Sequence, residues 1–106
     1  MGEKEFIVYL DEAHENRYRH WHMWRRGEIV EFRIQYEAWM AGRWQPIVRY
    51  DTAHGQPHRD ILHPARTQTK EMYPGRSDAE MLTLGQEDIM ENWSSYRAKY
   101  EQEAGQ

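Results

Sequence analysis

The sequence predicts an α+β protein in which an antiparallel β-sheet of four to six strands, connected as a meander, packs on a C-terminal α-helix. Two observations lead to this prediction. The segment Val30–Met40 alternates apolar and polar side chains, which is the period-two pattern of a half-buried strand. From Ser77 onward, apolar residues recur at helical intervals instead. The 106 residues are expected to form one domain, with the sheet over about 5–73 and the helix over about 78–103.

The first two elements differ in how clearly the sequence marks them. Phe6–Leu10 is a short apolar strand that ends at two acidic residues. Arg17–Arg26 has an ambiguous period, so a helix from about residue 12 to about residue 25 competes with a strand there. As a strand, the segment would place four side chains on one face and four on the other: Tyr18, His20, His22 and Trp24 against Arg17, Arg19, Trp21 and Met23.

A hairpin is predicted where Val30–Met40 turns into Trp44–Asp51. The turn is assigned to the three residues 41–43. A three-residue loop pairs apolar residues across the two strands, whereas a two-residue loop would set charged residues opposite apolar ones. The preferred register therefore places Ile34 opposite Tyr50 on the apolar face and Arg33 opposite Asp51 on the polar face.

The next segments continue the meander and then give way to the helix. A loop over 52–57 leads into a strand over 58–63, and a last strand is predicted over 67–73. If the first of these strands returns as a hairpin, His58 lies opposite Asp51 and Asp60 opposite Arg49. The helix begins with the capping-box spacing Ser77-x-x-Glu80, and a glycine at position 85 could kink or divide it.

Charge is distributed unevenly along the chain. Residues 1–15 carry one basic and five acidic residues, 16–76 carry eleven and six, and 77–106 carry two and seven, so the segments sum to −4, +5 and −5. Five of the six histidines lie in the basic middle segment. Such a segment favours an anionic ligand, although a sheet of mixed surface charge between acidic ends gives the same numbers. The absence of cysteine excludes disulfides, cysteine-based zinc sites and a cysteine nucleophile.

Histidine, arginine and aspartate cluster around the loop over 52–57. On the predicted register, the polar face gathers two arginines, two aspartates and one histidine, and a second histidine lies in the loop. Histidines can exchange protons, carboxylates can orient a histidine, and arginines can bind phosphate. The candidate catalytic residues are His54, His58, Asp51 and Asp60, and the candidate ligand- or phosphate-binding residues are Arg33, Arg49, Arg59, Trp39 and His63. Cross-strand ion pairs on a solvated face are the competing interpretation.

No metal ligand set is predicted, because no recognised ligand spacing occurs. A divalent metal stays a minor alternative. The pair His58 and Asp60, or the pair His20 and His22 on a strand, could contribute two ligands to such a site. Exposed tryptophans beside arginines could stack on unpaired bases or form a protein interface.

The motif Arg49-Tyr50-Asp51-Thr52-Ala53-His54-Gly55 resembles an uncharacterised family of small prokaryotic proteins. The resemblance covers roughly residues 30–100 and includes the flanking segments Tyr36–Ala38, Trp44–Val48, His58–Asp60, Asp88-Ile89, Asn92-Trp93 and Tyr96-Arg97. More loosely, the order of elements is similar to TumE-type toxins of toxin–antitoxin pairs, which implies a small protein that acts on RNA or blocks translation. The loop here lacks a run of adjacent histidines after the aspartate.

The expected function is accordingly that of a small RNA-directed protein, such as a metal-independent, toxin-like ribonuclease or a translation inhibitor. A non-enzymatic binding subunit of a prokaryotic defence or nucleoprotein complex is the alternative, and a His/Asp metal-binding protein is the third. The expected partners are RNA or another anionic ligand, and an antitoxin or complex subunit, with a homodimer as a further option. No membrane association is expected, because no apolar run reaches the ~20 residues of a membrane span, and a cytoplasmic location follows.

Overall fold

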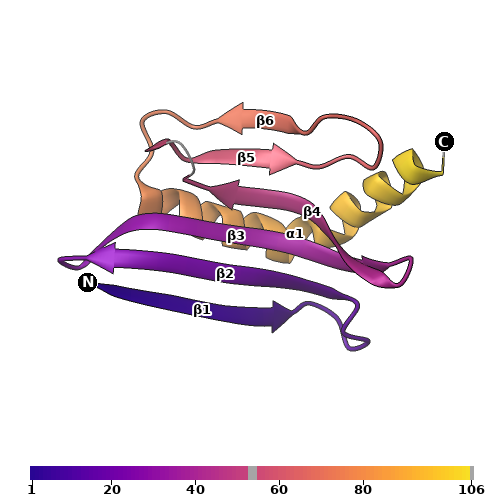
Figure 1. Cartoon of the computed structure of the whole chain (residues 1–106), viewed down its shortest axis with the longest axis horizontal. Coiled ribbons are helices and arrows are strands. Elements are labelled where there is room, and N and C mark those ends of the chain that lie inside the picture. Colours follow the sequence, from indigo (N-terminus) through magenta and orange to yellow (C-terminus); the bar gives the residue numbers. More distant parts are fainter. Residues whose placement is uncertain (53–54, 106) are drawn as a thin grey trace.

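The computed structural model describes residues 1–52 and 55–105. In this part of the chain, six strands precede one helix and pair antiparallel in chain order, so the predicted α+β meander is confirmed (Figure 1). The elements are β1 (Gly2–Tyr9), β2 (Asn16–Arg25), β3 (Glu28–Met40), β4 (Arg43–Asp51), β5 (His58–Ile61), β6 (Thr69–Met72) and α1 (Asp78–Ala104).

The segment whose period was ambiguous is strand β2. It pairs with β1 on one side and with β3 on the other, so its backbone groups find partners along both edges. Tyr18 and His20 are buried, while Arg19 between them is exposed, as the alternation of a strand requires. A tight turn at Arg26 and Gly27, both with positive φ, carries the chain into β3.

The β3–β4 hairpin has the predicted pairing over most of its length but a different turn. Ile34 lies opposite Tyr50 and Arg33 opposite Asp51, as predicted. Near the turn, however, Met40 pairs with Arg43, so the loop has two residues rather than three, and both have positive φ. A β-bulge at Ile47 supplies the extra residue and restores the register. The side chain of Ile47, the extra residue of the bulge, is buried in the core.

The β4–β5 hairpin has the predicted register. Asp51 lies opposite His58, and Arg49 lies opposite Asp60. Strand β5 ends at Ile61 rather than at residue 63, and β6 is a short edge strand whose four residues are all exposed.

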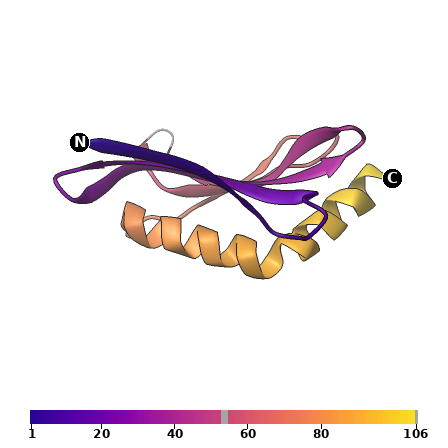
Figure 2. The same ribbon diagram turned by 90° about the horizontal axis from the view of Figure 1, so that it is seen from below.

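Helix α1 is continuous and covers one face of the sheet (Figure 2). The Ser77 side chain accepts a hydrogen bond from the backbone of Glu80, and the Glu80 side chain accepts one from the backbone of Ser77, which completes the predicted capping box. Gly85 does not divide the helix, which runs through it without a break. Instead, it lets the helix approach the sheet closely, because a Cβ there would lie 2.8 Å from Cγ of Tyr50.

The two faces of the sheet differ in character. The face under α1 contains the buried core, which includes Phe32, Ile34, Tyr36 and Tyr50. The opposite face carries the alternate residues of each strand and is mostly polar. We call it the open face, and its central residues are Glu5, Arg17, Arg19, Trp21, Arg33, Gln35, Glu37, Arg49, Asp51, His58 and Asp60.

Candidate metal centre

Three buried titratable side chains meet on the open face at β4 and β5. Asp51 is the last residue of β4, and the hairpin register places His58, the first residue of β5, directly opposite it. Asp60 follows His58 by two residues and therefore points to the same face. Strand alternation and register together account for this convergence.

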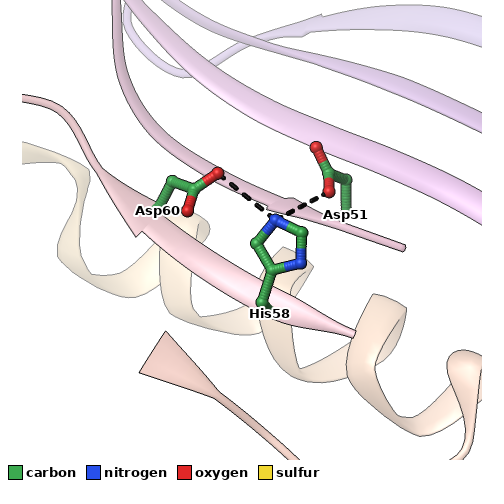
Figure 3. Close-up of side chains that lie close together, drawn as sticks. All are labelled: Asp51, His58 and Asp60. Carbon is green, nitrogen blue, oxygen red and sulfur yellow. Dashed lines mark ion pairs between the residues drawn. The ribbon is translucent and has the colours of Figure 1, made fainter. Parts of the chain in front are cut away.

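The imidazole of His58 lies between the two carboxylates (Figure 3). Its Nε2 is 3.0 Å from Oδ1 of Asp51 and 3.3 Å from Oδ2 of Asp60. Its Nδ1 is 3.1 Å from the carbonyl oxygen of Gln56, and a carbonyl can only accept, so Nδ1 carries a hydrogen and donates. Nε2 is thus the ring nitrogen left to interact with both carboxylates. Ligand atoms of all three residues lie within 4.8 Å of one another, close enough to hold a metal ion.

The centre is shielded from water. The side chains of Asp51, His58 and Asp60 are each at most 5% exposed. Oδ1 of Asp60 is buried and has no hydrogen-bond partner within the described residues. Arg33 approaches from solvent, with Nε 3.4 Å from Oδ2 of Asp51 and half of its side chain exposed. A buried carboxylate oxygen without a donor is costly, so this oxygen marks a place where a cation would be stabilised.

Three of the other predicted site residues lie on the open face or at its edge. Arg33 and Arg49 lie on the open face beside the centre, where Nε of Arg49 donates to Gln35 at 2.7 Å. Trp39 is 40% exposed at the tip of the β3–β4 hairpin, where its ring meets that of Trp44 edge-on. His54 lies outside the described residues.

Arg59 and His63 lie away from the centre. Arg59 projects from the face under α1, where it donates to the Tyr96 hydroxyl at 3.0 Å and pairs with Glu71. Its neighbours in sequence point to the open face, so strand alternation separates Arg59 from the carboxylates. The His63 side chain is buried beyond the end of β5, where Nδ1 lies 2.7 Å from Glu103 of α1. Both residues thus connect the sheet or its following loop to the helix.

Arginines of the basic middle segment have carboxylate neighbours on the open face. Arg17 pairs with Glu37 at 2.8 Å, and Arg19 pairs with Glu5 of β1 at 3.6 Å. The acidic N-terminal segment therefore lies against the basic one, which the charge count along the sequence could not show. The Arg19–Glu5 pair is about half exposed, so its contribution to stability is small.

A cavity of about 740 Å³ adjoins the centre on the open face. Its lining includes Arg33 and Asp51 together with Arg19, Trp21 and Thr52. Arg19 and Trp21 are absent from the sites predicted from sequence, because the segment that carries them could not be assigned to a strand. The period-two pattern over 16–25 was the signal that could have placed them on the same face as Asp51.

The chain belongs to a family of uncharacterised proteins: residues 1–106 match the family described as "Domain of unknown function (DUF7718)". No curated protein and no solved structure matches the chain. Within the described residues, no helix is both long enough and apolar enough to cross a membrane.

Proposed function

We propose that Asp51, His58 and Asp60 bind a divalent metal ion, and that this ion acts on a phosphate-bearing ligand such as RNA. The observation that carries the proposal is the convergence, within 4.8 Å, of two carboxylate oxygens and one imidazole nitrogen from three buried residues. One partly exposed arginine, Arg33, stands beside them.

The orientation of His58 supports metal binding. Histidine ligands usually coordinate through one ring nitrogen while the other donates to a backbone carbonyl or a carboxylate, which fixes the tautomer and the ring orientation. In His58, Nδ1 donates to the carbonyl of Gln56 and Nε2 faces the carboxylates. When Nε2 carries no hydrogen, its lone pair and the two carboxylate oxygens form a set of three electron-rich atoms that would hold a cation between them.

The charge of the buried group leads to the same conclusion. Two carboxylates meet in this buried centre, and burying negative charge is costly unless it is paired. Arg33 offsets part of this charge on Asp51, and Oδ1 of Asp60 lacks a donor in the described structure. A divalent ion would neutralise the two carboxylates and give Oδ1 of Asp60 a partner.

The donor set favours manganese or zinc. Carboxylates suit Mg²⁺, Ca²⁺ and Mn²⁺, imidazole suits Zn²⁺ and other transition metals, and a mixed set is shared by Mn²⁺ and Zn²⁺. Three protein ligands leave coordination positions open, which is typical of catalytic rather than structural sites. When bound, such an ion polarises a phosphoryl oxygen and activates water. The residues of this chain would hold the ion, and Arg33 and Arg49 would attract the phosphate.

Metal binding is tested by calorimetric titration of chelator-treated protein with MnCl₂ and with ZnCl₂. We expect one site per chain in the wild type, and at least a tenfold loss of affinity in Asp60→Asn and in His58→Gln. His63→Gln is the matched control, because His63 is also a buried histidine beside a carboxylate but lies outside the centre. Wild-type protein that binds neither ion, or that binds equally well after both substitutions, would contradict the proposal.

The arginines of the open face favour RNA as the ligand, and cleavage of RNA as the activity of the bound ion. Arg19, Arg33 and Arg49 lie on adjacent strands of one face, next to Trp21. Guanidinium groups bind phosphates, and tryptophan rings stack on unpaired bases. The buried Nε2 of His58 faces two carboxylates rather than solvent, so we favour a metal-dependent reaction over direct proton transfer by His58.

Cleavage of a fluorescent single-stranded RNA at low salt tests this activity, with Mn²⁺ in one arm and a chelator in the other. We expect cleavage with Mn²⁺ only, and its loss in Asp60→Asn and His58→Ala. Cleavage in chelator that requires His54 and His58 would instead favour the metal-independent mechanism expected from the sequence. Rates equal to background in every arm would remove the ribonuclease proposal.

A further inference from the structure

We infer that the cavity beside Asp51 binds a nucleotide, with the base on Trp21 and the phosphate on Arg19 and Arg33. The inference deepens the proposed function, on which it rests for the role of the neighbouring metal, but the binding itself requires no metal. The cavity volume of about 740 Å³ is within the range of small-molecule sites, which runs from about 300 to about 1,000 Å³.

The strand register brings the two arginines and Trp21 to neighbouring positions on the open face. Trp21 of β2 lies opposite Arg33 of β3, and Arg19 follows on the same face of β2 two residues away. All three side chains line the cavity. An aromatic side chain beside two arginines combines a stacking platform with phosphate binding, which are the two parts of nucleotide recognition.

The indole ring of Trp21 also forms a hydrogen bond to a residue of β1. Its Nε1 donates to Oε1 of Glu3 on β1 at 2.7 Å. This hydrogen bond uses the polar edge of the indole and restrains the ring. A ring that is already ordered loses little conformational freedom when a base stacks on it, which favours binding.

Both arginines can turn to a ligand at small cost. Arg19 contacts Glu5 at 3.6 Å, and both side chains are about half exposed, so this ion pair is weak. Arg33 uses Nε toward Asp51, and the described structure gives no partner to its two Nη groups. A phosphate could therefore accept from the Nη groups of Arg33 and from the fork of Arg19 without breaking a buried pair.

The acidic part of the lining distinguishes a nucleotide from a simple anion. Glu5, Glu31, Asp51 and Asp78 also line the cavity. Carboxylates repel a small free anion, but they accept hydrogen bonds from ribose hydroxyls and from the amino groups of bases. A ligand with a single phosphate at one end and several donors at the other end matches this mixed lining better than phosphate or a polyanion does.

The nucleotide could be free or part of an RNA strand, because both present the same base, ribose and phosphate. Binding is measured by calorimetry in a chelator, with four probes: adenosine monophosphate, adenosine, inorganic phosphate and a five-residue oligoadenylate. We expect the monophosphate to bind at one site, and adenosine and phosphate to bind at least tenfold more weakly. Tighter binding of the oligoadenylate than of the monophosphate identifies a strand as the source, and equal or weaker binding identifies a free nucleotide.

The variants Arg19→Gln and Trp21→Leu should each weaken binding of the monophosphate at least tenfold. Arg66→Gln and Trp39→Leu are the matched controls. Arg66 is an exposed arginine beside Glu103, and Trp39 is an exposed tryptophan outside the cavity lining. Both controls should stay within twofold of wild type. Urea unfolding curves establish that all four variants are folded before binding is measured.

Three results would overturn the inference: no binding of the monophosphate, unchanged binding in both cavity variants, or phosphate that binds as tightly as the monophosphate. Asp60→Asn separates this outcome from that of the metal proposal. It should weaken metal binding at least tenfold and leave monophosphate binding in chelator unchanged, since Asp60 is not part of the cavity lining. A failure of the metal proposal can therefore be distinguished from a failure of the nucleotide proposal.

Discussion

The hydroxyl of Tyr50 donates a hydrogen bond to Oδ2 of Asp88 at 2.7 Å and so connects the centre of the sheet to the middle of α1. The same carboxylate oxygen accepts from the Tyr96 hydroxyl at 2.5 Å. Burial, followed by the hydrogen bond to Asp88, raises the pKa of Tyr96 to about 12. The same two causes raise the pKa of Tyr50, so both hydroxyls keep their hydrogens and remain donors at neutral pH.

Removing the carboxylate of this group should cost more stability than removing one hydroxyl. Asp88→Ala leaves both tyrosine hydroxyls without their acceptor, and we expect a loss of about 2–4 kcal/mol in the free energy of unfolding. Tyr50→Phe removes only one donor and should cost about 1–2 kcal/mol. Tyr100→Phe is the control, because the described structure gives its hydroxyl no side-chain hydrogen bond. Urea unfolding measures all three, and equal losses in Asp88→Ala and Tyr100→Phe would contradict the assignment.

Gly85→Ala should destabilise the protein even though alanine favours helices. The added Cβ would lie 2.8 Å from Cγ of Tyr50 and 3.2 Å from Cγ2 of Ile34, and both side chains are fully buried. We expect overpacking to cost about 1–3 kcal/mol and helix propensity to return about 1 kcal/mol, which leaves a net loss of up to about 2 kcal/mol in the free energy of unfolding. Gly105→Ala, where the nearest atom is 3.6 Å away, is the control. A Gly85→Ala variant with a higher thermal midpoint than wild type would refute the close approach.

Stability should fall between pH 6.5 and pH 4 because of His20. Burial, and then the charges of His22 and Lys4, lower the pKa of His20 from 6.5 to about 4. Between these values the unfolded chain binds a proton that the folded protein does not, so stability is present above pH 6.5 and decreases as the pH falls. The loss amounts to up to about 3 kcal/mol and should level off below pH 4.

The comparison that isolates this effect is the pH dependence of urea unfolding in wild type and in His20→Gln. Other groups also titrate in this range, but the substitution removes only the contribution of residue 20. We expect a shallower slope in His20→Gln than in wild type. Identical slopes in the two proteins would show that His20 is protonated equally in the folded and unfolded states.

Metal binding at Asp51, His58 and Asp60 should stabilise the fold. An ion that binds only the folded state adds about 2.7 kcal/mol at a concentration one hundred times its dissociation constant. Differential scanning calorimetry should therefore show a higher midpoint with Mn²⁺ or Zn²⁺, and the increase should vanish in Asp51→Asn. The increase should also shrink at acidic pH, because protons compete with metal for the ligands. An equal increase in wild type and variant would assign the effect to another site.

The strand registers could be predicted because each depends on a local pattern. Alternation over Val30–Met40 identified the buried face, and that face determined which residues of β4 lie opposite β3. The same reasoning, applied to β5, placed His58 opposite Asp51. Proximity of the two aspartates and His58 follows from these registers. Their chemical roles remain predictions.

The remaining features depend on contacts between distant segments. The bulge at Ile47 compensates for a two-residue turn, and the predicted three-residue loop gives the same pairing farther along the strands. The contact of His63 with Glu103 joins residues 40 positions apart. Arg17–Arg26 carries apolar and charged residues at both helical and strand spacing, and pairing with neighbours on two sides determines its conformation. Neither the bulge nor the contact of His63 with Glu103 leaves a local sequence pattern.

The meander also has a consequence for how the chain folds. Every strand pairs only with the strand before or after it in the sequence, so each hairpin closes a short loop at a low entropic cost. Topologies rich in such local pairings fold faster than sheets that must bring distant strands together. The candidate centre lies within one hairpin, between residues 51 and 60. We therefore expect its ligands to be brought together early, while helix α1, which follows the six strands in the chain, docks afterwards and completes the core.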